Sequence, residues 1–288
     1  MTGWLIYDAH SAARNEWFIG QMQRVAAERG VSLLLRYGER LQIGVGRLEE
    51  GAAPTLLRYD GAPVPPPDFV LNRCIFPLLS RALENAGIPV FNSADAAEIC
   101  NDKRRTHLFL RESGIPMPDS LFLDRRYIDP TTLPPFPYII KSADGHGGTE
   151  VFFVDSPEAL SRALASFRSS GILLQRPVSD LGRDMRVYVL GGRIIGAVLR
   201  HSDSDFRSNY SLGGQVSLVE PDESVRRAVA LVTERLPLTY AGIDFIFDRG
   251  KPLLNEIEDI VGARMLYALT HRDICREYLD CVLSSLSR

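Results

Sequence analysis

The sequence predicts an α/β protein divided into α+β lobes, and two observations support this fold class. In the first hundred residues, short apolar runs suited to strands alternate with helical hydrophobic patterns. Beyond a proline-rich stretch, the pattern changes to apolar runs that are paired across short turns and interrupted by helices. With 288 residues, of which 45% are hydrophobic, the chain is long enough for two or three closely packed lobes.

The first lobe is predicted to occupy residues 1–100. Its order of strand, helix and strand is typical of a small α/β unit. The expected strands are 4–7, 31–36, 69–72 and 87–92, and the expected helices are 16–29 and 78–86.

A lid lobe is predicted for residues 101–175. Asn101 and Asp102 are suited to cap a helix, which we expect to run from Lys103 toward Ser113. The proline-rich stretch 130–137 continues neither a helix nor a central strand, so we expect it to connect two lobes. Beyond it, we expect strands at 138–140, 151–154 and 172–174, and a helix with Pro157 in its first turn.

A C-terminal lobe is predicted for residues 176–288. Apolar runs on both sides of tight turns indicate antiparallel hairpins, and a helical hydrophobic pattern lies between them. The expected hairpins join 184–190 to 193–199 and 243–247 to 253–257, and the expected helix is 223–235.

Composition argues against two classes of partner. A formal net charge of −3 and a pI near 6.0 provide no general attraction to nucleic acid or anionic lipid. The start of the sequence lacks a signal-peptide pattern, and no apolar run approaches the length of a membrane span. The four cysteines have no metal-ligand spacing. We therefore expect a cytoplasmic protein that binds neither nucleic acid nor membrane.

A glycine-rich loop between two predicted strands is the first candidate for chemistry. It runs from Lys141 to Thr149, whereas a Walker loop leads from a strand into a helix. Glycines let backbone amides approach phosphate oxygens, and a lysine at the strand end supplies a compact positive charge. The alternative is a glycine-rich hairpin turn beside a solvated lysine.

Three further segments carry polar groups, each with a structural alternative. The proline in 175–178 removes one backbone donor and leaves neighbouring groups free to meet an adenine edge, unless this is an ordinary strand exit. Asp184 and Arg186 share one strand face, an arrangement that is also common for structural ion pairs. The run 200–214 offers side chains for phosphate or carboxylate oxygens, unless it is a solvated surface loop: Arg200, Arg207 and Asn209.

Acidic residues recur in the last predicted hairpin. A three-residue turn would pair Asp244 with Glu256 and place Glu258 on the same face, whereas a two-residue turn would pair Asp244 with Asn255. Converging carboxylates repel one another near a core unless a cation compensates them. Magnesium prefers oxygen ligands and commonly bridges carboxylates and nucleotide phosphates, so we expect it here. The alternative is an exposed acidic hairpin.

Taken in order, these segments resemble the ATP-grasp superfamily, most closely the branch that contains the RimK-type glutamate ligases, the lysine-biosynthesis ligases and bacterial glutathione synthetase. No single segment is specific for this superfamily, but the occurrence of all of them in this order along most of the chain is specific. The segments that carry the resemblance are 101–103, 114–118, 140–148, 175–178, 182–187, 200–214, 241–244 and 256–258.

The resemblance implies an ATP-grasp fold with a Rossmann-like N-terminal lobe, a small lid and a C-terminal lobe. It also implies a role for each matching residue. Lys103 and Lys141 would hold ATP phosphates beneath a closing loop that contains Gly145, His146, Gly147 and Gly148. Gln175, Arg176, Pro177 and Val178 would frame adenine, and Asp184 would complete the nucleotide site. Asp244, Glu256 and Glu258 would bind Mg²⁺ or Mn²⁺, and Arg200, Arg207 and Asn209 would stabilise the transferred phosphoryl group.

The activity that the resemblance implies is an ATP-dependent carboxylate–amine ligase. It would form an acyl phosphate on an amino acid or peptide, release ADP and phosphate, and work as a homo-oligomer. A small-molecule kinase and an ATP-binding interaction module are the alternatives. The family's last metal motif usually reads Glu-x-Asn, whereas this chain has Glu258 in place of the asparagine. Arg264 is a candidate for a substrate carboxylate, with a surface arginine as the alternative, and Arg73 is a candidate for the substrate cleft.

Overall fold

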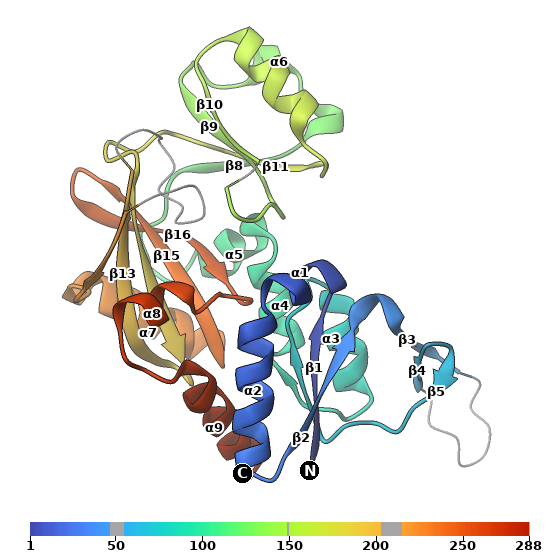
Figure 1. Cartoon of the computed structure of the whole chain (residues 1–288). Coiled ribbons are helices and arrows are strands. Elements are labelled where there is room, and N and C mark those ends of the chain that lie inside the picture. The colour runs from blue at the N-terminus through green and yellow to red at the C-terminus, as the bar shows by residue number, and fades with distance from the viewer. Residues whose placement is uncertain (47–54, 149, 203–214, 288) are drawn as a thin grey trace.

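The protein is described by a computed structural model that covers residues 1–46, 55–148, 150–202 and 215–287. Figure 1 shows a lid lobe above two larger lobes, with the N-terminal lobe and the C-terminal lobe side by side. The α/β fold class is confirmed. Among the described residues, no helix has the length and apolar character that crossing a membrane would need.

The N-terminal lobe is built on a parallel sheet with the strand order β2-β1-β6-β7. Alternate residues of its central strands face opposite sides of the sheet. Leu5 and Leu71 therefore meet one helix, α2, whereas Trp4 and Val70 meet α3 on the other face. The strands are β1 (Thr2–Tyr7), β2 (Ser32–Tyr37), β6 (Phe69–Asn72) and β7 (Val90–Phe91), and the helices are α1 (Ala9–Arg14), α2 (Glu16–Glu28), α3 (Pro77–Asn85) and α4 (Ala94–Cys100).

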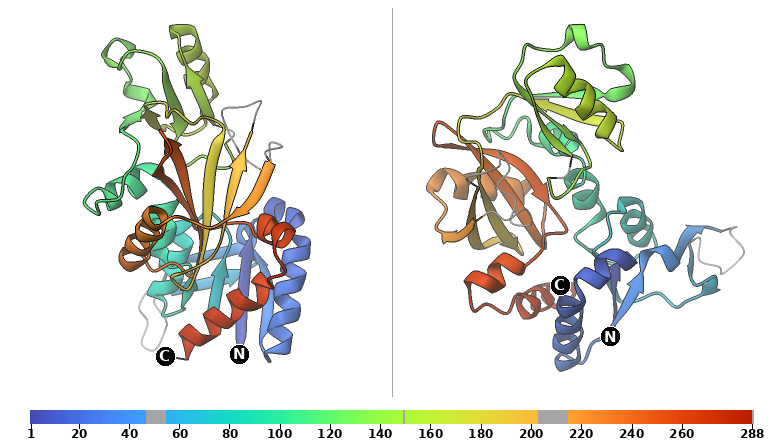
Figure 2. Two further views of the ribbon diagram at one scale, coloured as in Figure 1. Left: turned by 90° about the vertical axis from the view of Figure 1, so that its left-hand side faces the viewer. Right: turned by 45° about the horizontal axis from the view of Figure 1, so that its top comes forward.

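A small antiparallel sheet that the sequence analysis did not predict projects from this lobe. Its strands are β3 (Leu41–Val45), β4 (Thr55–Tyr59) and β5 (Ala62–Pro63), in the order β3-β4-β5. The right-hand view of Figure 2 shows it extending away from the other lobes. Short 3₁₀ helices elsewhere are Gly38–Arg40, Arg125–Tyr127 and Pro130–Thr132.

The lid lobe is an antiparallel sheet with α6 (Pro157–Ser166) packed on one face through Leu160 and Ala163. Its strand order is β10-β9-β11-β8. The proline-rich stretch lies between two strands of this one sheet, so the prediction that it connects two lobes was wrong: it is a loop inside the lid. The strands are β8 (Ser120–Asp124), β9 (Tyr138–Ser142), β10 (Val151–Val154) and β11 (Gly171–Gln175).

The C-terminal lobe contains a five-stranded antiparallel sheet with the order β14-β13-β12-β15-β16. One face packs against α7 (Glu223–Arg235) and the segment from α5 (Lys103–Leu110) to Ile115. Helix α5 lies within the range 101–175 that was predicted as the lid lobe, but it packs against the C-terminal sheet instead of the lid sheet. The strands are β12 (Arg183–Leu190), β13 (Arg193–His201), β14 (Gln215–Val219), β15 (Tyr240–Asp248) and β16 (Lys251–Glu258).

The last two helices close the gap between the N-terminal and C-terminal lobes. They are α8 (Arg264–Leu269) and α9 (Ile274–Leu286), and α9 lies against α2 (Figures 1 and 2). Apolar side chains of α9, such as Leu279, share one buried core with Met22 of α2 and Tyr188 of β12. The two lobes consequently share a continuous core.

Asn92 fastens this junction with four hydrogen bonds. Its side-chain amide donates to the carbonyl oxygens of Tyr240 (2.9 Å) and Asp259 (2.8 Å). Its side-chain oxygen accepts from the backbone amides of Thr239 (2.7 Å) and Tyr240 (3.1 Å). Because Asn92 is buried, all four backbone groups depend on this one side chain.

We predict that Asn92→Ala lowers the free energy of unfolding by roughly 2–4 kcal/mol, because it leaves buried backbone groups without partners. Chemical denaturation followed by circular dichroism measures this change. The control is Asn85→Ala, which alters an exposed asparagine of α3 and should change stability by at most about 0.5 kcal/mol. Equal losses in the two variants would refute the role of Asn92.

Candidate active site

Three adjoining cavities run from the lid toward the N-terminal lobe. The lid cavity lies between the lid and C-terminal lobes, the junction cavity lies beside β16, and the N-lobe cavity is bordered by α1 and the end of β6. Lys103, Arg200 and Glu256 line both of the first two cavities. Arg14, Glu258, Gly262 and Arg264 line both of the last two. The shared residues make the three cavities neighbours in one cleft.

Two lysines meet where the lid cavity adjoins the junction cavity. Lys141 is buried at the end of β9, and its Nζ donates to Oδ1 of Asn255 at 2.8 Å. Lys103 begins α5, where the Asp102 carboxylate caps the helix. Its Nζ donates to the carbonyl oxygen of Gly145 at 2.6 Å and lies 3.1 Å from Oε2 of Glu256. Burial, with help from the charge of Lys103 and against that of Glu256, lowers the pKa of Lys141 to about 8.

The glycine-rich loop borders both cavities. Gly145, Gly147 and Gly148 line the lid cavity, and His146 lines the junction cavity. The φ angles of Gly147 and Gly148 are +66° and +73°, values that residues with a Cβ rarely adopt. Burial lowers the pKa of His146, so its imidazole favours the neutral form. The predicted loop residues are thus placed together at the same cavities as the lysines.

The segment that was predicted to frame adenine lies at the end of β11. Gln175, Arg176 and Val178 line the lid cavity, whereas Pro177 is not among the residues that line it. The Gln175 side chain donates to Oγ of Ser120 at 2.7 Å, and this bond holds the strand end against β8.

A buried ionic cluster underlies the cavities on the C-terminal sheet. Asp244 is 1% exposed, and Arg186 donates to both of its oxygens at 2.8 and 2.7 Å. Arg200 donates from Nη2 to Asp244 at 2.7 Å and to Asp184 at 2.8 Å. Burial alone would raise the pKa of Asp244, but the charges of Arg186 and Arg200 outweigh it and hold the pKa well below its ordinary value.

This cluster gives Arg200 and Asp184 structural partners as well as a place in the lid cavity. Asp184 pairs with Arg200 across the β12–β13 ladder, and Arg186 pairs with Asp244 across the β12–β15 ladder. The other two residues that were predicted to handle the phosphoryl group, Arg207 and Asn209, lie outside the described residues.

The register of the β15–β16 hairpin combines features of both sequence-based alternatives. Its turn has two residues, with Asp248 opposite Lys251, yet Asp244 lies opposite Glu256. A β-bulge reconciles the two facts, because the ladder skips Asn255 between Glu256 and Leu254. The bulge releases the Asn255 side chain from the regular alternation, and this side chain accepts from Lys141.

Glu256 and Glu258 are the carboxylates that suit a divalent cation. Their side chains are 29% and 28% exposed, and both line the junction cavity. Each is ion-paired through Oε2, to Lys103 at 3.1 Å and to Arg186 at 2.5 Å, so each has a second oxygen to offer. Burial raises the pKa of Glu258 and the charge of Arg186 opposes this.

Asp244 differs from these two acids, because arginines already occupy both of its oxygens. Within the described ranges, no three His, Cys, Asp or Glu side chains converge as a metal cage. Magnesium often takes only one or two carboxylates and completes its shell with water and phosphate oxygens. Glu256 and Glu258 therefore fit Mg²⁺, and a role for Asp244 as third ligand stays a prediction that requires it to release an arginine.

His107 joins the two sides of the lid cavity, and the sequence analysis missed it because its partners are distant in sequence. Its Nε2 lies 3.0 Å from the carbonyl oxygen of Asn255, which only accepts, so Nε2 carries the proton. Its Nδ1 lies 3.2 Å from Oγ of Ser120, the same hydroxyl that receives Gln175. Burial lowers the pKa of His107, which favours this neutral form. The imidazole thus links β16, β8 and β11.

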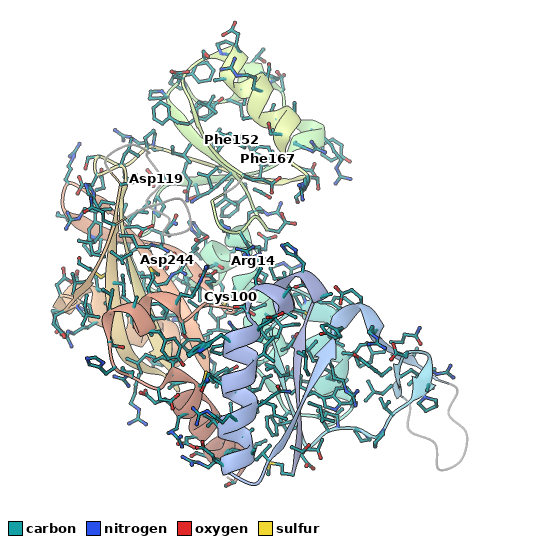
Figure 3. All side chains as sticks on the ribbon, viewed as in Figure 1. Arg14, Cys100, Asp119, Phe152, Phe167 and Asp244 are labelled. Carbon is teal, nitrogen blue, oxygen red and sulfur yellow. The ribbon has the colours of Figure 1, made fainter. Side chains whose placement is uncertain are left out.

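Arg14 was also missed, because a single arginine in an N-terminal helix carries no motif. It lies at the end of α1 and faces the junction cavity together with Arg186, Arg200 and Glu258. Figure 3 shows Arg14 and Asp244 in the central region where the lobes meet.

Comparisons with known proteins agree with this architecture. The family model described as a RimK-like ATP-grasp domain matches residues 100–282. A probable alpha-L-glutamate ligase of Xanthomonas euvesicatoria pv. vesicatoria is 28% identical over 247 residues, which cover 81% of this chain and 83% of that protein. The uncharacterized protein MG011 of Mycoplasma genitalium is 30% identical over 181 residues, which cover 62% of this chain and 61% of that protein.

Solved structures share the fold at low sequence identity. The ATP-grasp ligase PsnB complexed with minimal precursor has a TM-score of 0.68 and 18% identity, and the match covers 99% of this chain and 98% of that one. D-alanine–D-alanine ligase from Bacillus anthracis complexed with ATP has a TM-score of 0.70 and 17% identity, with coverage of 100% and 98%. The predicted ATP-grasp fold is confirmed.

We predict that Asp244→Asn lowers the free energy of unfolding by roughly 3–5 kcal/mol at pH 7, because two buried arginines lose their counter-charge. The folded pKa of Asp244 is lowered, so its contribution is present above the unfolded pKa near 3.9 and is lost as pH falls through the folded pKa. The difference from wild type should therefore narrow below about pH 4.

Denaturant titrations at pH 7, 5 and 3 measure this difference. Asp155→Asn is the matched control, because Asp155 is exposed and has no such cluster around it. A loss for Asp244→Asn that stays constant from pH 7 to pH 3 would contradict the electrostatic explanation.

Proposed function

This chain belongs to the RimK-like ATP-grasp family, and we propose that it is an ATP-dependent carboxylate–amine ligase acting on an amino acid or peptide. The observation that carries the proposal is the meeting of Lys103, Lys141 and Glu256 where the lid cavity adjoins the junction cavity. Buried lysines that face a cavity suit a polyanion such as a triphosphate. The junction cavity, next to the proposed triphosphate position, offers space for a second reactant.

The proposed reaction has two steps. A substrate carboxylate oxygen attacks the γ-phosphorus of ATP, the bond to the bridging oxygen breaks, and ADP leaves with that electron pair. An amine nitrogen then attacks the carbonyl carbon of the acyl phosphate, and orthophosphate leaves as the amine releases a proton. Both steps concentrate negative charge between the two cavities, where Arg200 and Lys103 supply positive charge.

Each group of residues then has a role in binding. Lys103, Lys141 and the glycine-rich loop would hold the phosphates, while Gln175 to Val178 would border adenine. Glu256 and Glu258 would hold Mg²⁺ or Mn²⁺, which offsets phosphate charge when bound. The names of two relatives support the reaction class, since one is a probable glutamate ligase and another is a D-alanine–D-alanine ligase.

The proposal extends to location and partners. A ligase of this kind would work in the cytoplasm on small molecules or peptides that carry a carboxylate and an amine. The net charge of −3 supports the expectation of no nucleic-acid partner. Assembly into a homo-oligomer follows from the family resemblance alone.

We predict that ATP, Mg²⁺ and pooled amino acids and short peptides give acceptor-dependent orthophosphate and a product whose mass equals condensation with loss of water. Glu256→Gln should lower the rate at least about a hundredfold, because it removes a carboxylate at the phosphate end. Phosphate release and mass spectrometry measure the two quantities. A product that gains one phosphoryl group would instead identify a kinase, and ATP binding without turnover would favour an interaction module.

A second prediction follows from the lowered pKa of Lys141. As pH rises through about 8, Lys141 loses its charge, so the affinity for a non-hydrolysable ATP analogue should fall about five- to tenfold between pH 7.5 and 9.5. Lys141→Arg keeps its charge across this range and should flatten the dependence. Calorimetric titration measures both, with Lys251→Arg, an exposed site, as control. An unchanged slope in Lys141→Arg would rule out Lys141 as the cause.

A further inference from the structure

The acidic and basic side chains that line the N-lobe cavity differ in whether they have partners within the protein. Its three carboxylates all have a partner: Asp8 accepts from the Ser11 amide at 2.8 Å, Glu39 accepts from the Ala9 amide at 2.8 Å, and Glu258 forms an ion pair with Arg186 at 2.5 Å without a hydrogen bond to its Oε2 from the described residues. Each acid of this cavity therefore already has a contact within the protein, and Glu258 is the one among them that is paired with a cation in the part of the chain that the structure describes.

The arginines of the same cavity fall into two kinds. Arg73 is buried and donates from Nη2 to the carbonyl oxygen of Val261 at 2.7 Å, so it is part of the lobe junction. Arg14 and Arg264 are exposed, and among the described residues neither makes a hydrogen bond or an ion pair. They come from α1 and α8 and line both the junction and N-lobe cavities. Two arginines without a described partner, Arg14 and Arg264, thus place positive charge beside the proposed reaction centre.

An apolar lip borders the cavity on the N-terminal lobe. Ile75 and Phe76 line it and remain 52% and 45% exposed. Phe76 is also the N-cap residue of α3, and its side chain makes no capping hydrogen bond. Ser, Thr, Asp or Asn would stabilise that position better, so helix stability does not explain the phenylalanine.

We infer that this cavity binds the acyl donor, and that the donor is a carboxylic acid with an apolar side chain next to its carboxylate. Arg14 and Arg264 hold the carboxylate, and the apolar side chain lies against Ile75 and Phe76. Two guanidinium groups also reduce the repulsion between a carboxylate and the triphosphate that it must approach. This inference rests on the proposed ligase function and narrows its substrate class.

The cavity volume is about 620 Å³, which accommodates an amino-acid derivative or the end of a peptide. The position of Arg14 and Arg264 on both cavities directs the carboxylate toward Glu256 and Lys103. The apolar group lies on the far side, away from the phosphates.

The test uses three probes with the full chain, ADP and Mg²⁺. N-acetyl-L-phenylalanine carries both features, N-acetylglycine lacks the apolar side chain, and N-acetyl-L-phenylalaninamide lacks the carboxylate. None has a free amine, so none can serve as acceptor. Calorimetric titration should give N-acetyl-L-phenylalanine a Kd at least about tenfold lower than either of the others.

Variants then separate the two contacts. Phe76→Ser should abolish the preference over N-acetylglycine, and it places a better N-cap on α3, so loss of folding cannot explain the result. Arg14→Gln and Arg264→Gln should each weaken binding of the acid about tenfold and leave the amide unchanged. The matched controls are Leu78→Ser, an exposed apolar residue of the same segment outside the cavity lining, and Arg105→Gln, an exposed arginine outside it.

An activity assay with hydroxylamine as the amine acceptor distinguishes failure of this inference from failure of the ligase proposal. N-acetyl-L-phenylalanine should give a hydroxamate and orthophosphate with a kcat/KM at least about tenfold above that of N-acetylglycine. Equal use of both acids, or equal effects of Phe76→Ser and Leu78→Ser, would overturn the inference while the ligase function stands. Selective binding that depends on Phe76 and Arg14, without phosphate release from any acid, would support the site and remove the ligase function.

Discussion

The C-terminal sheet depends on the neutralisation of one carboxylate, Asp244. A charged group that is almost completely withdrawn from water is tolerated only when partners replace its hydration. Arg186 does so from the adjacent strand β12, and Arg200 does so from β13, one strand further along the sheet. Those arginines reach outward to Glu258 and Asp184, so one buried charge sets the positions of groups that face two cavities. The residues that stabilise the sheet and the residues that line the proposed site therefore lie on the same four strands, β12, β13, β15 and β16.

The link from this sheet to the lid passes through an irregularity of β16. The bulge at Asn255 turns its side chain toward Lys141 and its carbonyl toward His107. In a regular strand the Asn255 side chain would follow the alternation of its neighbours, and Lys141 would lose this hydrogen bond. The contact with Asn255 also restricts the Lys141 side chain. One neutral hydrogen-bond acceptor offsets only part of the free-energy cost of burying its charge. The result is a cation that gains from any anion entering the cavity.

Sequence patterns were sufficient for the regular parts of the fold. The helix predicted at 223–235 matches α7, since its apolar face repeats at the helical period, and the hairpins around Gly191 and Gly250 follow from their turn residues. The bulge escaped prediction because it depends on which residues pair across the ladder, and the sequence of one strand does not show its register against the other. The proline-rich stretch was misassigned, since proline marks a break in regular structure without telling whether the break separates lobes or two strands of a sheet. Lys103, Lys141 and Glu256 were found through motifs, whereas His107 and Arg14 act through contacts that no local pattern encodes.

The packing of α9 on α2 has a consequence for how the chain is made. Leu279 and Val282 complete a core whose earlier members include Met22 and Val25, which leave the ribosome about 250 residues earlier. The first lobe is therefore synthesised before the segments that cover this apolar face, of which α9 is the last described. A chain that ended before residue 274 would lack α9, and the apolar side chains of α2 that α9 covers would then be open to water and to association with other chains.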